Sequence, residues 1–313
     1  MSGFKAKTIK AVISKKIAQW IETVEDENLR EQLQKNVIVT GGCVTSMLLG
    51  EPVNDFDVYF RDHATTLAAA QYYVARFKDK KGKTDFKLVV TDDEGRVKVR
   101  AQSVGAASET TPVGEYRYFE SFPDQEGVDY VNKVISDPEE IADTHEDTQI
   151  EIAKNPEERK YRPVFLSSNA ITLSDKVQIV LRFYGEPDLI HENYDFVHCT
   201  SYWKSWDGEL VLRPEALESC LSKELKYVGS KYPVCSVVRL RKFISRGWRI
   251  NAGQILKMCM QISELDLTDL DVLEDQLTGV DTAYFLQVIE RLREKDPEKV
   301  NTSYLVEILN RMF

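Results

Sequence analysis

The chain has 313 residues, of which 42% are hydrophobic and 29% are charged, and its formal net charge is −10. No apolar run approaches the roughly 20 residues that cross a bilayer, and the first residues lack the apolar core of a secretory signal, so we expect a cytoplasmic protein with no membrane partner. The five cysteines form no C-x-x-C pair and the four histidines form no H-E-x-x-H pair, which argues against a disulfide framework, a structural zinc site and a metalloprotease site.

The first predicted elements are a helix, a strand and a glycine turn. Residues 5–35 have the apolar spacing of one amphipathic helix. Residues 37–39 are β-branched and predict a strand that ends at Gly41-Gly42. A short helix over 43–50 and an alternating strand over 55–60 follow.

The middle of the chain begins with a helix over 63–78. Residues 84–103 then predict a β-hairpin whose tip is Asp93-Glu94-Gly95. Between residues 120 and 159 there are thirteen acidic and three basic residues, so the rest of the chain is close to neutral. This acidic stretch has few strong apolar anchors, and we expect helix fragments and loop there.

Strands resume after the acidic stretch, and a run of helices follows them. The expected strands span 164–173, 177–185 and 194–203. The expected helices span 214–226, 233–247, 251–263, 280–294 and 302–313. An α+β fold is therefore predicted, with a mixed-sheet domain over 1–211 that holds a long insertion at about 61–165, followed by an all-helical domain over 212–313.

The segment that indicates chemistry is the strand over 55–60. Successive side chains of a strand point to opposite faces, so Asp55 and Asp57 share one face, while Phe56, Val58 and Phe60 share the other and can enter the core. Two neighbouring aspartates repel each other unless a cation lies between them. Mg²⁺ is the cation expected, because it prefers carboxylate oxygens together with substrate phosphates. Two such ions can hold the attacking and the leaving oxygen of a nucleotidyl transfer.

The residues before this strand are suited to phosphate binding. Gly41 and Gly42 allow backbone N–H groups to approach a phosphate without a Cβ in the way. The hydroxyls of Thr45 and Ser46, close to a helix N-terminus, add donors for a triphosphate. A lone D-x-D or a lone G-G pair is more often a surface feature, but strand, Gly-Gly, short helix and D-x-D in this order favour a nucleotidyltransferase site.

Residues 41–60 resemble the head motif of class II CCA-adding enzymes and bacterial poly(A) polymerases, which belong to the DNA polymerase beta-like nucleotidyltransferase superfamily. The family pattern G-G-x-V-R-D-x-L-L-G-x-P-x-x-D-x-D is matched without gaps. The matching residues are Gly41, Gly42, Val44, Leu48, Leu49, Gly50, Pro52, Asp55 and Asp57. The departure is Thr45-Ser46 in place of an Arg-Asp pair that handles the nucleotide sugar, so the choice of sugar and base is not implied.

The resemblance implies a third carboxylate on a later strand. Asp195 is the candidate, because the segment around it is rich in aromatic and β-branched residues. The alternative is that Asp195 only begins a strand. Asp92, Asp93 and Glu94 are competing candidates, although a hairpin tip explains them better. The segment over 177–193 is similar to viral and phage nucleotidyltransferase-like proteins.

A second resemblance lies in residues 236–250, which are similar to the neck helix that follows the head in class II enzymes. Arg239, Lys242 and Arg246 lie on one helical face, which implies contact with a triphosphate or an RNA backbone. The alternative is a solvated basic face docked on the acidic stretch. The nucleotide-selection motif E-D-x-x-R is not matched at Glu274-Asp275, so templated addition of C and then A is not implied.

These resemblances together predict an enzyme similar to a polynucleotide adenylyltransferase. It would use two Mg²⁺ ions and a nucleoside triphosphate, with ATP expected, and the acceptor would be an RNA 3′ end. The alternatives are transfer to a protein or small-molecule hydroxyl, as in toxin-type relatives, and a non-catalytic nucleotide-binding homologue. Asp55, Asp57 and Asp195 are the implied metal ligands and catalytic residues. If the protein is viral, the host cytoplasm is the expected location.

Overall fold

A computed structural model describes residues 3–81, 86–93, 95–103, 118–120, 160–167 and 169–267, together with residues 269, 272 and 276. The chain divides into two compact units, each of which is described by itself. The first unit comprises Met1–Ser121, Glu158–Tyr194 and His198–Cys220, and the second comprises Phe122–Glu157, Asp195–Val197 and Leu221–Phe313. The predicted helices over 280–294 and 302–313, and all but the first residue of the acidic stretch, lie outside the described residues. The predicted domain boundary at residue 211 stays a prediction.

The N-terminal region forms two helices, α1 (Ala6–Glu22) and α2 (Glu27–Asn36), so the prediction of one helix over 5–35 is wrong. The physical reason is the cap at Asp26, whose side chain accepts a hydrogen bond of 3.0 Å from the Leu29 N–H and starts a new helix. The spacing of the apolar residues still places one face of α1 against the core. The buried residues of that helix are Ile9, Ile13, Ile17, Trp20 and Ile21.

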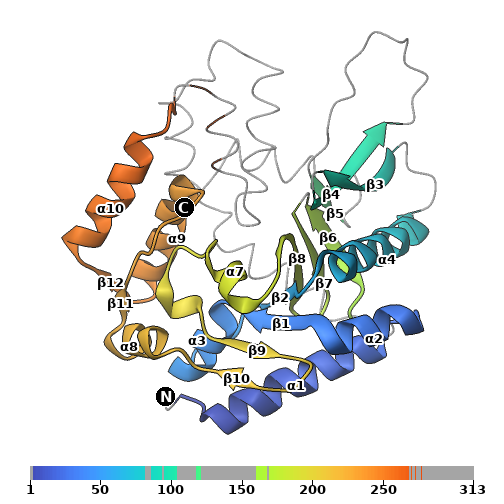
Figure 1. Ribbon diagram of the computed structural model, residues 1–313, viewed down its shortest axis with the longest axis horizontal. Coiled ribbons are helices and arrows are strands. Elements are labelled where there is room, and N and C mark those ends of the chain that lie inside the picture. Colours follow the sequence, from blue (N-terminus) through green and yellow to red (C-terminus); the bar gives the residue numbers. More distant parts are fainter. Residues whose placement is uncertain are drawn as a thin grey trace. The chain divides into compact units, whose positions relative to one another are not determined.

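The first unit is built on an eight-stranded sheet in the order β10-β9-β1-β2-β8-β7-β6-β5 (Figure 1). The strands are β1 (Val37–Thr40), β2 (Phe56–Phe60), β5 (Tyr118–Glu120), β6 (Pro163–Ser167), β7 (Ala170–Leu173), β8 (Val177–Tyr184), β9 (Tyr202–Lys204) and β10 (Leu210–Val211). The pair β2–β8 is parallel and the other neighbouring pairs are antiparallel. The predicted α+β fold with a mixed sheet is confirmed.

Two predicted elements within the region 61–165 are also confirmed. The helix α4 (His63–Lys81) follows β2, and β3 (Phe86–Asp93) pairs with β4 (Arg96–Ser103) as a hairpin. The helix α4 contributes Ala69, Tyr73 and Phe77 to the main core of the first unit. Part of the segment predicted to be an insertion therefore belongs to the core of this unit.

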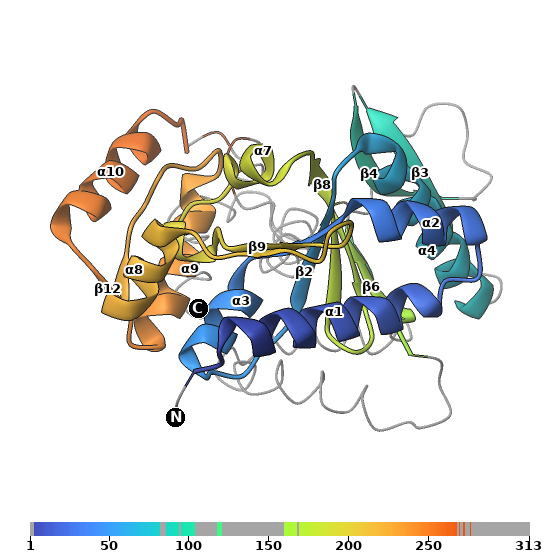
Figure 2. The ribbon, with the colours of Figure 1, turned by 60° about the horizontal axis from the view of Figure 1, so that its bottom comes forward.

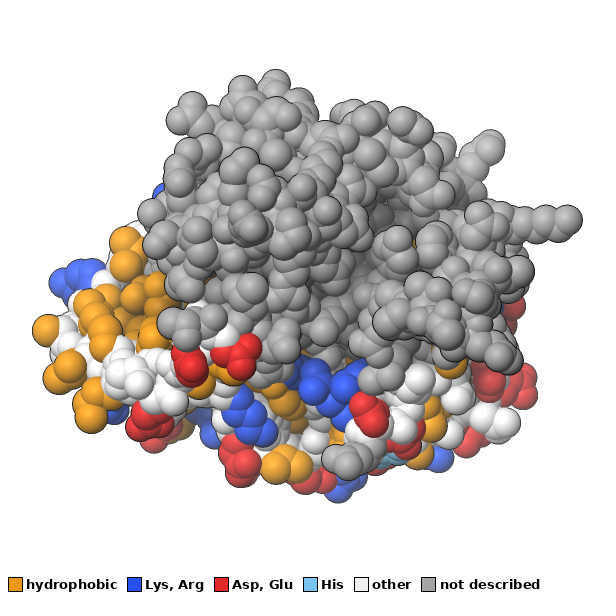
Figure 3. All heavy atoms as spheres, turned by 90° about the horizontal axis from the view of Figure 1, so that it is seen from above, with side chains coloured by type: hydrophobic (Ala, Val, Ile, Leu, Met, Phe, Trp, Pro, Cys, Tyr) orange, Lys and Arg blue, Asp and Glu red, His pale blue; other side chains and the backbone are white. Residues whose placement is uncertain are grey.

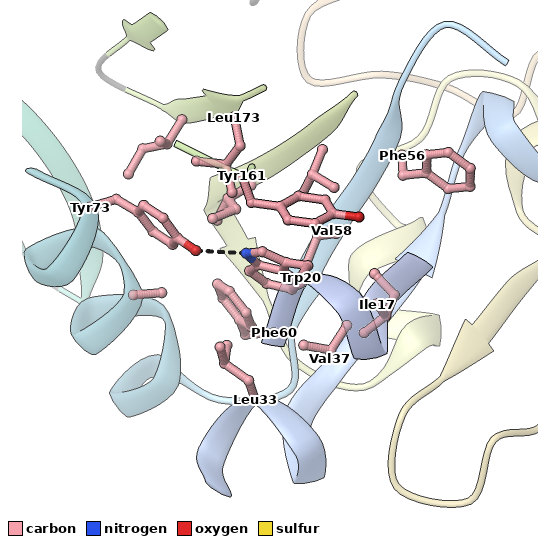
Figure 4. Close-up of a cluster of buried hydrophobic side chains, with 14 of the residues drawn as sticks. Ile17, Trp20, Leu33, Val37, Phe56, Val58, Phe60, Tyr73, Tyr161 and Leu173 are labelled. Atoms are coloured by element: carbon pink, nitrogen blue, oxygen red, sulfur yellow. Dashed lines mark hydrogen bonds between the residues drawn. The ribbon is translucent and has the colours of Figure 1, made fainter. Parts of the chain in front are cut away.

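The main core lies between the sheet and helices α1, α2 and α4, and its largest side chains come from each of these layers (Figure 4). Trp20 of α1 donates its indole N–H to the Tyr73 hydroxyl of α4 at 2.6 Å, and both rings are fully buried. Burial raises the pKa of the Tyr73 hydroxyl, so it stays protonated. This hydrogen bond satisfies two polar atoms in an otherwise apolar core.

The described part of the second unit contains α9 (Pro233–Ser245), α10 (Ala252–Ser263) and a two-stranded parallel sheet of β11 (Glu224–Leu225) and β12 (Arg249–Ile250). The prediction of an all-helical C-terminal part is therefore corrected by this small sheet. The aromatic ring of Phe196 packs against those of Tyr227 and Phe243. The outer face of α10 is hydrophobic: Ile255, Leu256 and Met260 are exposed, and hydrophobic side chains gather on that face in Figure 3.

Among the described helices, none is long and apolar enough to cross a membrane.

Candidate active site

The candidate site is built around a bend between β1 and α3 (Gly42–Leu49). Gly41 occupies this bend with φ of 91° and ψ of −153°, a backbone conformation that is essentially restricted to glycine. Its N–H donates to the Cys199 carbonyl at 3.1 Å. The β1–β2 register pairs Thr40 with Asp57, so the bend follows directly after the residue opposite Asp57.

Gly41 and the Asp57 carboxylate lie in close contact. A Cβ built on Gly41 would be 2.6 Å from Asp57 Oδ2, a separation that real Cβ atoms essentially never show. Gly42 differs, because a Cβ there would meet no atom within 4 Å, and this residue is exposed as the first residue of α3. The bend therefore holds one glycine against the carboxylate and leaves the backbone of the next one open to a ligand.

Asp55 and Asp57 both direct negative charge at the start of α3. Burial raises the pKa of the Cys43 thiol well above its usual value, and the charges of Asp57 and then Asp55 raise it further. Both aspartates are half-buried. The N-terminal N–H groups of a helix have no partner within the helix and favour negative charge. The two carboxylates and the start of α3 thus form one polar site in the first unit.

The predicted alternation along β2 is confirmed. Phe56, Val58 and Phe60 are buried in the main core. Tyr59 lies on the opposite face, in a small cluster with Ile38 and Ile190. Because side chains two residues apart share a face of a strand, Asp57 lies on the same side of the sheet as Tyr59.

The small cluster on the Asp57 side of the sheet includes a half-buried tyrosine whose hydroxyl oxygen is buried. The ring of Tyr194 lies 6.1 Å from that of Tyr59, measured between centroids. Burial raises the pKa of the Tyr194 hydroxyl well above its usual value, and the Tyr59 and Asp57 groups raise it further. Tyr194 therefore stays protonated beside the Asp57 carboxylate.

The two hydroxyls predicted to contact phosphates differ in their surroundings. Thr45 is buried, and its hydroxyl donates to the His198 carbonyl at 2.7 Å. A hydroxyl has only one proton to donate, so in this structure Thr45 fixes α3 to the turn at Val197–Cys199. Ser46 is half-buried. Of the two hydroxyls, Ser46 is therefore the one available to donate to a phosphate.

A hydrogen-bond network that the sequence does not reveal supports the bend. The Thr40 hydroxyl lies 2.9 Å from His191 Nε2 and 3.0 Å from the Ser201 carbonyl oxygen. The carbonyl can only accept, so the hydroxyl donates to it and the imidazole donates its Nε2–H to Thr40. Burial, followed by the charge of Arg213, lowers the pKa of His191 to about 3, so the ring is neutral near pH 7. Residues 151 positions apart form this contact, and no local sequence signal predicts it.

Asp195 does not lie on a strand, and this prediction is wrong. The residue is at a bend, followed by an isolated bridge at Phe196 and a 3₁₀ turn over Val197–Cys199. The backbone there pairs with a distant segment, since the Val228 N–H donates to the Asp195 carbonyl at 2.9 Å. These long-range contacts override the local preference of aromatic and β-branched residues for a strand.

The buried Asp195 carboxylate is paired with Arg239 of α9 at 2.8 Å, within the second unit. Two residues with separate predicted roles, one as a metal ligand and one as a phosphate contact, thus neutralise each other in this structure. Lys242 is half-buried in the last turn of α9, and Arg246 is exposed immediately after it. The nucleotide-binding roles of these three basic residues stay predictions.

Asp92 and Asp93, the competing candidates for the third carboxylate, lie in the β3–β4 hairpin, as the sequence predicted. Asp92 lies 3.1 Å from the His63 imidazole, and Asp93 forms an ion pair with Lys98 at 3.0 Å. Glu94 lies outside the described residues.

Asp55 and Asp57 are the candidate ligands for a metal ion. Within the described part of the chain, no group of three or more His, Cys, Asp and Glu side chains is arranged to hold a metal ion. Mg²⁺ nevertheless binds proteins through as few as one or two carboxylates, with waters and substrate phosphates as the remaining ligands. Asp55 and Asp57, both half-buried beside the bend, fit that pattern as a pair.

Comparison with known proteins gives one family match. Residues 11–223 match the family described as Gabija anti-defense 2 family protein. No curated protein sequence matches the chain.

Among solved structures, the chain is similar to a CCA-adding enzyme in complex with ATP, with 13% identity, a TM-score of 0.40, and coverage of 100% of this chain and 55% of the enzyme. It is also similar to a tRNA-processing enzyme with CTP (11% identity, TM-score 0.39, 90% and 57% coverage). A third is the Thermotoga maritima CCA-adding enzyme complexed with tRNA (14% identity, TM-score 0.38, 95% and 53% coverage). The chain spans just over half the length of these proteins.

Proposed function

The chain belongs to the Gabija anti-defense 2 family, and from its candidate site we propose that it is a metal-dependent nucleotidyltransferase. It moves a nucleoside monophosphate from a nucleoside triphosphate to a hydroxyl, and an RNA 3′ end is the proposed acceptor. ATP is the proposed donor.

The observation that supports this proposal is the contact between the Gly41 bend and the Asp57 carboxylate. A Cβ at Gly41 would lie 2.6 Å from Asp57 Oδ2, so a glycine is required for this approach. The open backbone at Gly42 starts α3 directly after the bend. A triphosphate at the start of α3 would therefore have carboxylates beside it, and these carboxylates would hold divalent ions close to the phosphates.

The proposed reaction is a displacement at the α-phosphorus. The acceptor hydroxyl oxygen forms a bond to this phosphorus, the bond from the phosphorus to the bridging oxygen of the β-phosphate breaks, and pyrophosphate leaves. The hydroxyl proton passes to a base or to water. The N–H groups at the start of α3 and the Ser46 hydroxyl orient the phosphates, and Asp55 and Asp57 would hold the divalent ions. Bound Mg²⁺ would supply charge stabilisation for the attacking and leaving oxygens.

The role of Asp195 as a third carboxylate remains a separate prediction. Its pairing with Arg239 means that the proposal rests on Asp55 and Asp57 alone. If Asp195 takes part in transfer, Asp195→Asn abolishes transfer under conditions in which the variant is still folded.

A second candidate function is transfer to a protein hydroxyl. The family description favours it, because an anti-defense protein is expected to change some component of a defence system. Such a role agrees with the predicted viral or phage origin and with action in the host cytoplasm. Both candidates use the same site and differ only in the acceptor.

Incubation of the protein with each α-labelled triphosphate, Mg²⁺ and either total cell RNA or total cell protein separates the two candidates. We expect label in RNA from the wild type and none from Asp57→Asn. The matched control is Glu31→Gln, which neutralises an exposed carboxylate of α2 that is paired with Lys35. Label in the protein fraction alone would favour the second candidate, and transfer by Asp57→Asn would contradict the proposed function.

A further inference from the structure

The helix α1 has a strongly basic outer surface in an acidic protein. Five lysines lie between residues 5 and 21, and no acidic residue occurs there. Four of them are exposed and the fifth, Lys16, is half-buried. The lysines are Lys5, Lys7, Lys10, Lys15 and Lys16.

None of these lysines is in a salt bridge with a described carboxylate, whereas several other basic residues of the first unit are. Several other basic side chains of the unit form ion pairs with nearby carboxylates. Such pairs include Lys35 with Glu31 (3.5 Å), Arg76 with Glu25 (2.6 Å), Lys98 with Asp93 (3.0 Å) and Lys204 with Asp207 (2.9 Å). Within the part of the chain that the structure describes, the positive charge of α1 thus has no counterion in a salt bridge.

Two further lysines extend this surface beyond α1. Burial lowers the pKa of Lys16, Asp175 opposes this effect, and the positive charges of Lys176 and Lys160 lower the pKa further. The Lys16 ammonium also lies 5.2 Å above the Tyr161 ring, just before β6. Figure 2 shows α1 running beside β6. We call these seven lysines, the five of α1 with Lys160 and Lys176, the α1 basic surface.

The composition of this surface favours phosphates over apolar partners. The isoleucines and Trp20 of α1 are buried in the core, so the helix has no apolar face left for a lipid surface. Lysine is also depleted in protein–protein interfaces, whereas it is the usual neutralising group for nucleic-acid phosphates. The 17 residues of α1 span about 25 Å at roughly 1.5 Å per residue, which is enough to follow several nucleotides.

The N-terminal end of the α1 basic surface contacts α3, the helix that begins at the candidate active site. The Phe4 N–H, two residues before α1, donates to the Met47 carbonyl in the last turn of α3 at 2.8 Å. The other end of α3 begins at Gly42, and its eight residues span about 12 Å. An RNA strand that follows α1 toward its N-terminus would thus reach α3, whose first residue follows the Gly41 bend.

We propose that the α1 basic surface binds the phosphate backbone of single-stranded RNA and so holds the acceptor of the reaction. The inference rests on the proposed function for the role of the RNA, although binding itself can be measured without transfer. It places acceptor binding on the first unit, whereas the sequence indicated Arg239 and its neighbours in the second.

The test measures binding of a fluorescent single-stranded RNA of mixed sequence by anisotropy, using full-length protein with Asp57→Asn so that the probe is not modified. The variant is Lys7→Glu/Lys15→Glu, at two exposed positions of α1. The matched control, Lys35→Glu/Lys257→Glu, makes the same change of net charge at exposed positions of α2 and α10. Lys7→Gln/Lys15→Gln provides a milder variant if charge reversal disturbs folding.

At low salt we expect the α1 variant to bind RNA at least about tenfold more weakly than the control. We also expect the slope of log affinity against log salt concentration to be smaller in magnitude by about 1.4, because each of the two lost phosphate contacts contributes about 0.7. Equal affinities of variant and control would overturn the proposal. So would a lower melting temperature with unchanged RNA affinity, because the lysines would then neutralise carboxylates of this chain. If the α1 variant binds RNA more weakly as expected but no triphosphate supports transfer, RNA binding by the α1 basic surface is confirmed and the proposed function is wrong.

Discussion

Gly41→Ala is the substitution that most sharply tests the geometry of the bend. Gly41 has φ of 91° and ψ of −153°, and an alanine there would place its Cβ 2.6 Å from Asp57 Oδ2. The backbone conformation alone costs on the order of 1–3 kcal/mol for a residue with a Cβ. The contact then forces the Asp57 carboxylate to move, because the Cβ is fixed to the backbone and cannot rotate away.

The stability of Gly41→Ala is measured by denaturant unfolding, with Gly42→Ala as the matched control. A Cβ on Gly42 meets nothing within 4 Å and this residue is helical, so alanine there is expected to stabilise the protein by about 0.4–1 kcal/mol. For Gly41→Ala we expect a loss of about 1–3 kcal/mol in the free energy of unfolding. Transfer should also fall at least about a hundredfold, because misplacing a reacting group by an ångström has this effect.

The reasoning would be refuted if Gly41→Ala were as stable as Gly42→Ala. If Gly41→Ala were both stable and fully active in transfer, the contact between Gly41 and Asp57 would not be needed for the reaction.

Three other predictions concern buried polar groups. First, His191 has a pKa of about 3 in the folded protein, below its unfolded value of 6.5, so its contribution to stability is complete above pH 6.5 and is lost as the pH falls. The unfolding free energy of the wild type should therefore fall more steeply between pH 6.5 and 3 than that of His191→Gln, by up to about 1.4 kcal/mol per pH unit, and parallel curves would contradict this. Second, Arg239→Ala leaves the buried Asp195 carboxylate without this partner and should lower the free energy of unfolding by about 1–3 kcal/mol. Adding Asp195→Asn should recover part of the loss in a double-mutant cycle, and additive losses would argue against the pair. Third, Tyr73→Phe removes the acceptor of the buried Trp20 N–H and should cost about 1–3 kcal/mol in chemical unfolding with transfer unchanged, whereas no loss would mean that this hydrogen bond is not formed.

The local parts of the fold and site could be predicted from periodicity and turn chemistry. Alternation over residues 55–60 correctly divided β2 into a face in the main core and an opposite face that carries Tyr59, because the side-chain period of a strand is fixed by its geometry. The glycine pair was correctly expected to form a turn, although only the structure shows that Gly41 contacts Asp57 and Gly42 does not.

Other features depend on contacts that are distant in the sequence. The hydrogen bond between Thr40 and His191 joins β1 to the end of α7 (Pro187–His191), and neither residue lies in a recognisable motif. The backbone at Asp195 leaves the expected strand because it pairs with Val228. The break between α1 and α2 is different, since Asp26 is a strong N-cap residue that indicates a helix start within the sequence itself.

The central claim is that Asp55 and Asp57 support nucleotidyl transfer, and the most direct measurement follows both ends of the nucleotide. ATP labelled at the α-phosphate or at the γ-phosphate is incubated with Mg²⁺ and RNA, and the label is traced to the RNA or to free pyrophosphate. We expect the α label on RNA and the γ label in pyrophosphate in equal amounts, with both lost in Asp55→Asn/Asp57→Asn. Equal transfer by this double variant, or γ label on the RNA, would contradict the account.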